Sequence, residues 1–168
     1  SVAPAALVRA GEADVIVVDS TGFVLLDEAE ASSSDAPVLR HLTGKEATRA
    51  LEVATASFIG VVGGRSVVAI ETSRDEAWGR WEHLRTVGWQ LDGDDAALAL
   101  TALALAGWHA NYRYCPRCGA PVQLVSGGWA ARCETCDRLE YPRQDPAIIV
   151  LVQDHDGRVL LAHNALWR

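Results

Sequence analysis

Tyr114-Cys115-Pro116-Arg117-Cys118-Gly119 and Arg132-Cys133-Glu134-Thr135-Cys136-Asp137 are the two stretches that decide how this chain folds. Each holds two cysteines in a C-x2-C pattern, fourteen residues separate the pairs, and all four cysteines of the chain are in them. Such a pair bends its backbone into a tight knuckle that aims two thiolates at one point. Four thiolates about 2.3 Å from one ion describe a structural zinc site. The predicted zinc ligands are Cys115, Cys118, Cys133 and Cys136.

The alternative reading of the cysteines is a pair of disulfides, for which three connectivities exist. Cysteines two residues apart are poorly placed to bridge within a knuckle, and four paired thiols fit a reducing cytoplasm. A shell of four cysteines leaves no open position for water or substrate, so we expect a structural metal and not a catalytic one. Gly119 and Asp137 follow the knuckles and suit a left-handed backbone that points amides at the sulfurs.

Composition predicts a folded chain with a packed core. Almost half of the 168 residues are apolar, 22% are charged, and the net charge of −7 argues against a protein that simply coats nucleic acid. Residues 111–145 are the least acidic part, with five arginines against four acidic side chains. No signal segment is apparent, and the longest apolar run, Ala96 to Trp108, is far shorter than a membrane span of about 20 residues. We therefore expect a cytoplasmic protein.

Before the knuckles, the pattern predicts an α/β domain. Two hairpins are expected, one over Ala13 to Asp27 and one over Phe58 to Glu71 that turns at Gly63-Gly64. Glu28 to Pro37 is acidic and rich in serine, which predicts a surface loop. Thr43-Gly44-Lys45-Glu46 has the spacing of a capping box and predicts a helix through about Ser57.

Tryptophans and a long apolar stretch complete this domain. Trp78 and Trp81 are three residues apart, which predicts a short helix whose tryptophans pack in the core. The stretch from Ala96 to Asn111 predicts a helix that is apolar around most of its circumference. Such a helix is expected to be buried on most sides, between domains or against a partner subunit.

After the first knuckle, Val122 to Val125 and Trp129 to Arg132 predict a hairpin, so that the module is a ribbon between two knuckles. Ala147 to Gln153 and Arg158 to His163 predict another hairpin, whose first strand is apolar on both faces. That strand has the character of a central strand in a larger sheet. Together with the start at Ser1, the lack of methionine and the stop at Arg168, it predicts a piece of a longer protein.

The sequence offers little support for other metal, catalytic or phosphate-binding sites. The five histidines share no ligand spacing, so we expect each to be solvated or hydrogen-bonded, and no serine or cysteine nucleophile is recognisable. Gly60 to Gly64 lacks the lysine and helix of a phosphate-binding loop. Tyr141 is different because it stands where the ribbon ends, before Pro142, where pockets tend to form. Its ring is placed to stack on a flat heterocycle.

Several of these stretches together resemble the NADH pyrophosphatase branch of the Nudix hydrolases. The resemblance rests on both knuckles, on Tyr141-Pro142-Arg143, on Asp145 to Ile149, and on Leu84-Arg85 with the apolar helix. It implies an α+β chain in three parts: an N-terminal α/β domain (1–111), a four-cysteine zinc ribbon (112–141) and the first hairpin of an α/β/α Nudix domain (142–168).

The family resemblance also implies an activity and site residues. In that family, water attacks the pyrophosphate of NAD(H) with the help of Mg²⁺ or Mn²⁺, giving nicotinamide mononucleotide and AMP, and some members remove NAD caps from RNA. The carboxylates that hold those ions belong to a glutamate-rich box expected beyond Arg168, so no catalytic residue is assigned and the chain alone is expected to be inactive. Tyr141 matches a residue at the nicotinamide end of the substrate. Arg85 matches a substrate contact if a single-residue gap is allowed, and a ribbon glutamate of some members falls at Gly128. Family members are homodimers.

The competing hypothesis is a zinc-ribbon module that binds nucleic acid or protein and has no chemistry of its own. Its supporting feature is the set of arginines in residues 111–145. A purely structural domain that dimerises is a third possibility.

Overall fold

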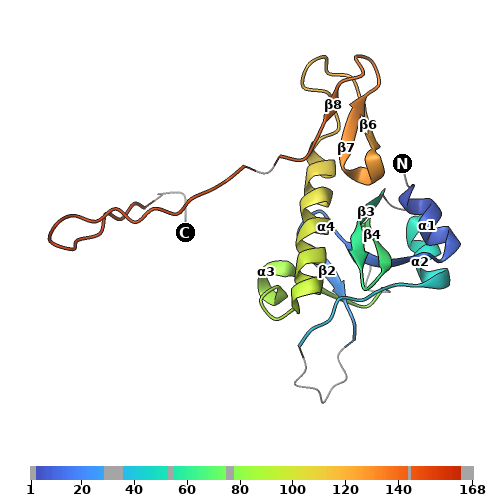
Figure 1. The fold of residues 1–168 in the computed structure, drawn as a ribbon, viewed down its shortest axis with the longest axis horizontal. Helices are drawn as coiled ribbons and strands as arrows, with labels where there is room; N and C mark the ends of the chain where they lie inside the picture. Colours follow the sequence, from blue (N-terminus) through green and yellow to red (C-terminus); the bar gives the residue numbers. More distant parts are fainter. Residues whose placement is uncertain (1–2, 29–35, 53–54, 75–77, 144, 164–168) are drawn as a thin grey trace.

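The computed structural model describes residues 3–28, 36–52, 55–74, 78–143 and 145–163. An N-terminal body, a small ribbon and an extended C-terminal segment follow one another along the chain (Figure 1). The predicted loop from Glu28 to Pro37 lies largely outside the described residues.

A mixed five-stranded sheet is the centre of the N-terminal body. Its strands run in the spatial order β3-β4-β1-β2-β5. Strands β1 and β4 are parallel, and the other neighbours are antiparallel. The strands are β1 (Ala13–Val18), β2 (Phe23–Leu26), β3 (Thr55–Val62), β4 (Arg65–Glu71) and β5 (Arg80–His83).

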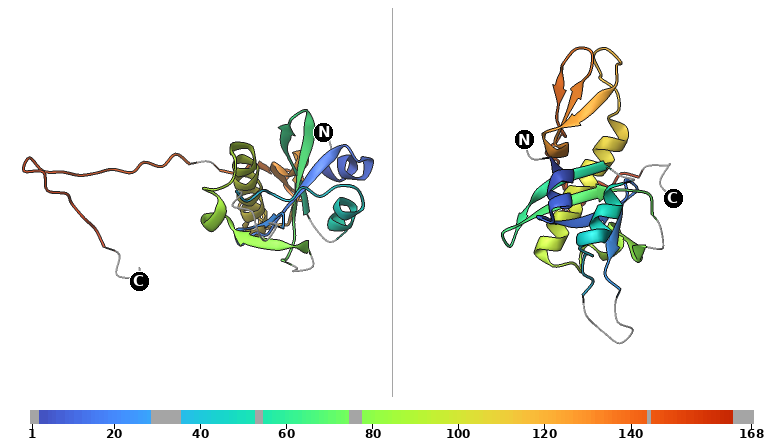
Figure 2. Two further views of the ribbon diagram at one scale, coloured as in Figure 1. Left: turned by 90° about the horizontal axis from the view of Figure 1, so that it is seen from below. Right: turned by 90° about the vertical axis from the view of Figure 1, so that its right-hand side faces the viewer.

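Helices cover both faces of this sheet (Figure 2, left). They are α1 (Pro4–Ala10), α2 (Gly44–Leu51), α3 (Leu84–Val87) and α4 (Gly93–Asn111). Along β1, Ile16 and Val18 pack in the core with α3 and α4, whereas Val15 and Val17 pack in the core with α1 and α2. Because successive strand residues point to opposite faces, a strand between two helical layers must be apolar throughout. This is the reason for the unbroken run of residues 15–18.

Both predicted N-terminal hairpins are confirmed, but two helical predictions are wrong. Helix α2 ends at Leu51 and not at Ser57, and the Thr43 side chain makes no capping hydrogen bond. The residues from Thr55 onward instead form β3, which pairs with β4 over its whole length. Trp81 lies in β5 opposite Leu25, so the two tryptophans do not share the predicted short helix, although both pack against the core as expected.

The long helix α4 begins three residues earlier than predicted. The Asp92 carboxylate accepts a hydrogen bond of 2.8 Å from the Asp95 amide and caps the first turn. Within this chain one face of α4 is buried, and Leu100 on another face is 61% exposed. That another domain or a partner subunit covers the exposed face stays a prediction. The buried face rests on the sheet because its alanines allow close approach.

Beyond α4 the chain forms the three-stranded ribbon. Strands β6 (Val122–Val125), β7 (Ala130–Cys133) and β8 (Leu139–Glu140) are antiparallel in that order, and the short 3-10 helix η2 (Ser126–Gly128) joins the first two. The predicted ribbon hairpin is therefore confirmed. In the described part of residues 142–163 one bridge, Gln153 to Val159, closes a turn that projects away from the body (Figure 1).

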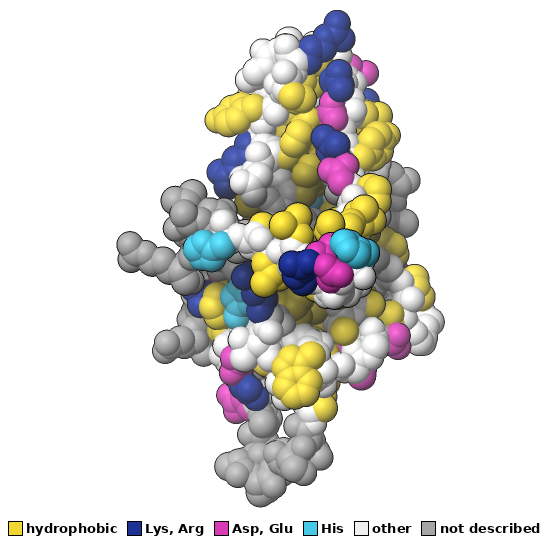
Figure 3. All heavy atoms as spheres, turned by 90° about the vertical axis from the view of Figure 1, so that its left-hand side faces the viewer, with side chains coloured by type: hydrophobic (Ala, Val, Ile, Leu, Met, Phe, Trp, Pro, Cys, Tyr) yellow, Lys and Arg dark blue, Asp and Glu magenta, His cyan; other side chains and the backbone are white. Residues whose placement is uncertain are grey.

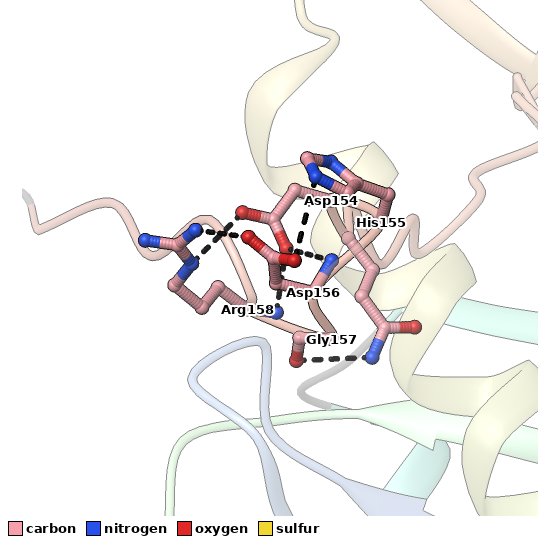
Figure 4. Close-up of polar contacts among 6 residues, drawn as sticks. Asp154, His155, Asp156, Gly157 and Arg158 are labelled. Atoms are coloured by element: carbon pink, nitrogen blue, oxygen red, sulfur yellow. Dashed lines mark hydrogen bonds and ion pairs between the residues drawn. The ribbon is translucent and has the colours of Figure 1, made fainter.

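That turn is organised by one carboxylate (Figure 4). Asp154 accepts hydrogen bonds of 2.9 Å from the amides of Asp156 and Arg158, and its ion pair with the Arg158 guanidinium is 3.0 Å long. The neighbouring apolar residues are exposed, Ile148 by 85% and Ile149 fully. A hairpin turn is thus present, whereas the predicted Nudix sheet around it stays a prediction.

Candidate metal centre

The two knuckles have the same backbone design. Gly119 and Asp137 follow their cysteine pairs with φ of 73° and 56°, the left-handed conformation expected from the sequence. The Gly119 amide donates to the Cys115 carbonyl at 2.9 Å, and the Asp137 amide donates to the Cys133 carbonyl at 3.2 Å. Each turn thereby folds back on its first cysteine.

The four sulfurs converge with the spacing of a tetrahedral metal site. Their Sγ atoms all lie within 4.8 Å of one another. Three separations are 3.5 Å (Cys118–Cys133), 3.7 Å (Cys115–Cys136) and 3.7 Å (Cys118–Cys136). A tetrahedron with sulfur about 2.3 Å from its centre has edges of about 3.8 Å, whereas a disulfide needs about 2.05 Å. All four cysteines are free, so the disulfide alternative is wrong and the donor set fits zinc.

The electrostatics of the cluster call for a cation. The Cys136 amide, 3.4 Å from the Cys133 sulfur, and the Thr135 amide both favour the Cys133 thiolate. Their effect outweighs that of burial, which favours the neutral thiol, and lowers the pKa of Cys133 to about 6. At Cys118 the Ala120 amide also favours the thiolate, but the neighbouring thiol groups, Cys133 first, raise the pKa to about 12. Cys118 and Cys133, whose sulfurs are 3.5 Å apart, are therefore not both ionised unless a cation is present. A divalent ion removes this conflict, and four-cysteine zinc needs no further ligand.

The ribbon has very little hydrophobic core besides the cluster. Its buried side chains are small: Ala130, Ala131, Cys115 and Cys133. A module of this size needs a metal or disulfides to fold, because too little apolar surface is removed from water. The metal is therefore expected to hold the ribbon together.

The ribbon docks on the edge strand β3 of the body. The Trp129 indole donates a hydrogen bond of 2.6 Å to the Phe58 carbonyl. The His109 Nε2 lies 2.8 Å from the Gly128 carbonyl and is its hydrogen-bond donor, because a carbonyl oxygen only accepts. A Cβ atom on Gly128 would lie 2.3 Å from the Ser57 Oγ, so no side chain fits at this position.

The two predicted substrate contacts lie on different parts of the molecule. Tyr141 follows β8 at the ribbon exit and is 60% exposed. Arg85 lies on α3 beside Leu84 and Trp89, at a small apolar pocket of about 260 Å³ that does not include Tyr141. The described structure does not bring the two residues into one cavity, and their roles stay predictions.

The arginines of the ribbon region do not form a basic face. Three of the five pair with nearby carboxylates: Arg132 with Asp137, Arg138 with Glu140, and Arg143 with Asp145. Basic and acidic side chains alternate on the ribbon surface (Figure 3, top). This arrangement removes most of the support for a nucleic-acid module, which would need uncompensated cations.

Sequence reasoning missed a large cleft beside the ribbon. A volume of about 1190 Å³ opens between the ends of β1 and β4, the end of α4 and strand β6. Asp19, Glu71 and His109 line it. The sequence holds no signal for this cleft, because these residues lie far apart along the chain and meet only at the sheet edge.

Together, the fold and the metal centre define a class of protein: a helix-covered mixed sheet joined through a long helix to a four-cysteine ribbon. Comparison with protein families identifies both parts. Residues 6–108 match the NADH pyrophosphatase-like rudimentary NUDIX domain, and residues 110–141 match the NADH pyrophosphatase zinc ribbon domain. The chain belongs to the NADH pyrophosphatase family, as the resemblance predicted.

Curated relatives share the same region. The NAD-capped RNA hydrolase NudC of Mycobacterium tuberculosis is 35% identical over 118 residues, which are 67% of this chain and 38% of the relative. The protein of that name from Pseudomonas fluorescens is 36% identical over 110 residues (63% and 39%). The chloroplastic Nudix hydrolase 19 of Arabidopsis thaliana is 31% identical over 121 residues (70% and 26%). The matches thus cover two-fifths or less of each relative's length.

No described helix is both long enough and apolar enough to cross a membrane.

Proposed function

We propose that this chain is the N-terminal and metal-binding part of a hydrolase that splits the pyrophosphate of NAD(H) or of NAD-capped RNA. The observation that carries the proposal is the joined pair of family matches, which place a rudimentary Nudix domain directly before the four-cysteine ribbon. Residues 1–111, 112–141 and 142–168 would be the N-terminal domain, the ribbon and the start of the catalytic domain. The protein would act in the cytoplasm, where its thiols stay reduced.

The described residues would supply scaffold and part of the substrate pocket. Mg²⁺ or Mn²⁺, held by carboxylates beyond residue 168, would polarise the phosphoryl oxygens and position the attacking water. Within this chain, the exposed ring of Tyr141 is available to stack on the nicotinamide, and Arg85 is available to contact the substrate. Zinc in the ribbon would orient Tyr141, which lies five residues after the last ligand.

Homodimer formation would give the uncovered surface of α4 a partner. Leu100 and Trp89 are 61% and 81% exposed beside the pocket at Arg85. Apolar side chains exposed in this way are typical of interfaces.

The test compares two lengths of chain. The 168-residue chain is expected to release no nicotinamide mononucleotide from NADH, whereas a version extended to the length of the relatives is expected to hydrolyse NADH with added Mg²⁺ or Mn²⁺. NADH turnover by the short chain would contradict the division of roles. If the extended chain bound RNA with a steep salt dependence and had no NAD cap preference, the interaction-module hypothesis would be favoured instead.

A further inference from the structure

The cleft beside the ribbon lies where open α/β sheets bind ligands. Strands β1 and β4 are parallel, and Val18 at the end of β1 is in register with Glu71 at the end of β4. The residues that follow both strands therefore lie at one edge of the sheet, outside the carboxyl ends, and line the cleft. Its volume of about 1190 Å³ is ample for a small ligand.

The first carboxylate of the cleft is already neutralised. Asp19 accepts hydrogen bonds from the Thr21 amide (2.8 Å) and hydroxyl (2.7 Å) and from the Phe23 amide (3.3 Å). It also forms an ion pair of 2.9 Å with the Nε of Arg74. The Arg74 guanidinium is held 3.8 Å over the Phe23 ring, so it is fixed in place, and its other N–H groups remain for a ligand.

The second carboxylate of the cleft, Glu71, lies opposite a histidine. His109 donates from Nε2 to the Gly128 carbonyl, so its Nδ1 faces the Glu71 carboxylate at 4.0 Å. Burial raises the pKa of Glu71. The nearby His109, a hydrogen bond from the Ser20 side chain and the charge of Arg113 oppose that rise in part.

One cation of the cleft, Arg113, is in ion-pair contact with no described carboxylate, although it is near enough to Glu71 to lower the pKa of that carboxyl. The Nε of Arg113 donates to the Ala110 carbonyl at 3.2 Å, and no carboxylate of the described residues lies within ion-pair distance of its guanidinium. The carbonyl end of α4 and the Glu71 carboxylate offset part of the Arg113 charge, and the guanidinium keeps N–H groups for a further partner. Around this centre the cleft wall carries hydroxyl side chains from two loops and β3: Ser20, Thr21, Thr55, Thr72 and Ser73.

We propose that this cleft binds a sugar phosphate, free or as part of a mononucleotide, with Arg113 and Arg74 on the phosphate and the hydroxyl and carboxyl groups on the sugar. Guanidinium groups match phosphate oxygens in geometry and charge, and hydroxyl and carboxylate oxygens accept from sugar hydroxyls. The binding does not depend on the proposed hydrolase activity, because every group involved lies within residues 19–113.

The test uses the zinc-loaded 168-residue chain and amide NMR spectra. Ribose 5-phosphate and AMP are each titrated, with ribose and adenosine as phosphate-free partners. Shifts are expected at residues 19–21, 71–74 and 113 with the phosphorylated ligands alone. Shifts with AMP but not with ribose 5-phosphate would show that the cleft requires a mononucleotide. Equal shifts with both would show that the sugar phosphate is sufficient.

Matched variants test the anchor. Arg113→Gln is expected to weaken binding about tenfold or more, because a hydrogen bond between charged groups is lost. Arg9→Gln, the same charge change on exposed α1 away from the cleft, should leave the affinity within about twofold. Arg113 also contacts the end of α4. If R113Q does not fold for that reason alone, the chemical shift of the Arg113 Nε–H in the unchanged chain, followed during titration with AMP, shows whether Arg113 binds the phosphate.

Three results would overturn the proposal. They are no shifts up to about 10 mM ligand, equal weakening by R9Q and R113Q, and an Arg113 Nε–H resonance that does not respond to phosphorylated ligand. Hydrolase activity of a longer chain would be unaffected by such a failure, so the two proposals fail separately.

Discussion

At the scale of single residues, Gly128 shows how one position can set the relation between two modules. Its φ of 96° and its contact with Ser57 leave room for hydrogen alone, and its carbonyl accepts from His109. Close approach of the ribbon to β3 requires this glycine.

Gly128→Ala is expected to lower the free energy of unfolding by about 2 kcal/mol or more, since strain at positive φ adds to overpacking. Gly11→Ala is the matched control, because Gly11 has φ of 72° but no atom within 4 Å of a Cβ. It should cost only about 1 kcal/mol. Chemical denaturation measures both variants, and equal losses would show that the Ser57 contact does not matter.

A second residue-scale prediction concerns pH and Asp19. Burial opposes ionisation of this carboxyl, but the Thr21 side chain, the Thr21 and Phe23 amides and Arg74 outweigh burial and lower its pKa from 3.8. A lowered folded pKa stabilises the protein above the ordinary value, and this stability disappears as pH falls below about 4 through the folded pKa.

Asp19→Asn is therefore expected to destabilise the chain by about 1 kcal/mol or more at pH 7, and the difference from the unchanged chain should shrink as pH falls below about 4. Asp14→Asn is the control, because the Asp14–Arg65 pair of 2.9 Å is at the surface and should contribute little. Thermal unfolding between pH 3 and 7 measures these differences. A pH-independent loss in D19N would contradict the electrostatic origin.

At the scale of elements, the ribbon and the sheet differ in what stabilises them. The two large hydrophobic clusters consist of residues 8–106, whereas the ribbon relies on its four sulfurs. Metal removal is therefore expected to unfold the ribbon and leave the sheet folded.

Chelation of the zinc-loaded protein should abolish amide protection in residues 112–141, while β1 and β4 keep theirs. Cys133→Ser should reproduce the effect without chelator, and Ser66→Cys, which adds a thiol outside the ribbon, should not. A metal content well below one zinc per chain in reducing buffer, or protection that survives chelation, would contradict the metal assignment.

Helix α4 and strand β6 show a further element-scale relation. Tyr112 stacks on Trp108 at 5.3 Å between ring centroids, where the helix passes into the ribbon. Tyr112 also lines the cleft whose far wall is β6. The ribbon therefore forms part of the wall of the cleft.

At the scale of the whole molecule, the segment from Ala147 to Val152 is apolar and exposed to water. In a longer chain these residues are expected to join a sheet and lose their exposure to water. Hydrogen exchange at residues 148–152 should be fast in the 168-residue chain and slow in the extended one. Equal exchange in both would contradict the assignment of this segment to a Nudix sheet.

Substrate recognition belongs to the same scale. In the extended enzyme, Tyr141→Ala is expected to raise the KM for NADH about tenfold, as loss of a stacking ring would do. Tyr114→Ala is a suitable control, because Tyr114 is similarly exposed, at 66% against 60% for Tyr141. Equal effects of the two variants would remove the special role given to Tyr141.

Local features of this protein could be predicted from the sequence because their causes lie within a few residues. The knuckles, the left-handed Gly119 and Asp137, the hairpins and the apolar helix all follow from neighbours along the chain. The end of α2 and the strand at Trp81 could not be read in this way. There, pairing with distant strands overrode a local helical pattern.

The sequence by itself determined the four-cysteine cluster, because two C-x2-C pairs at this spacing suit a single metal site, and it carried the motifs from which the family was predicted. Tertiary structure alone decided the parallel pairing of β1 with β4, the docking of Gly128 on Ser57 and the cleft lined by Asp19, Glu71 and His109. The physical reason is separation along the chain: contacts between residues some fifty positions apart depend on how the whole sheet closes, which no short pattern encodes.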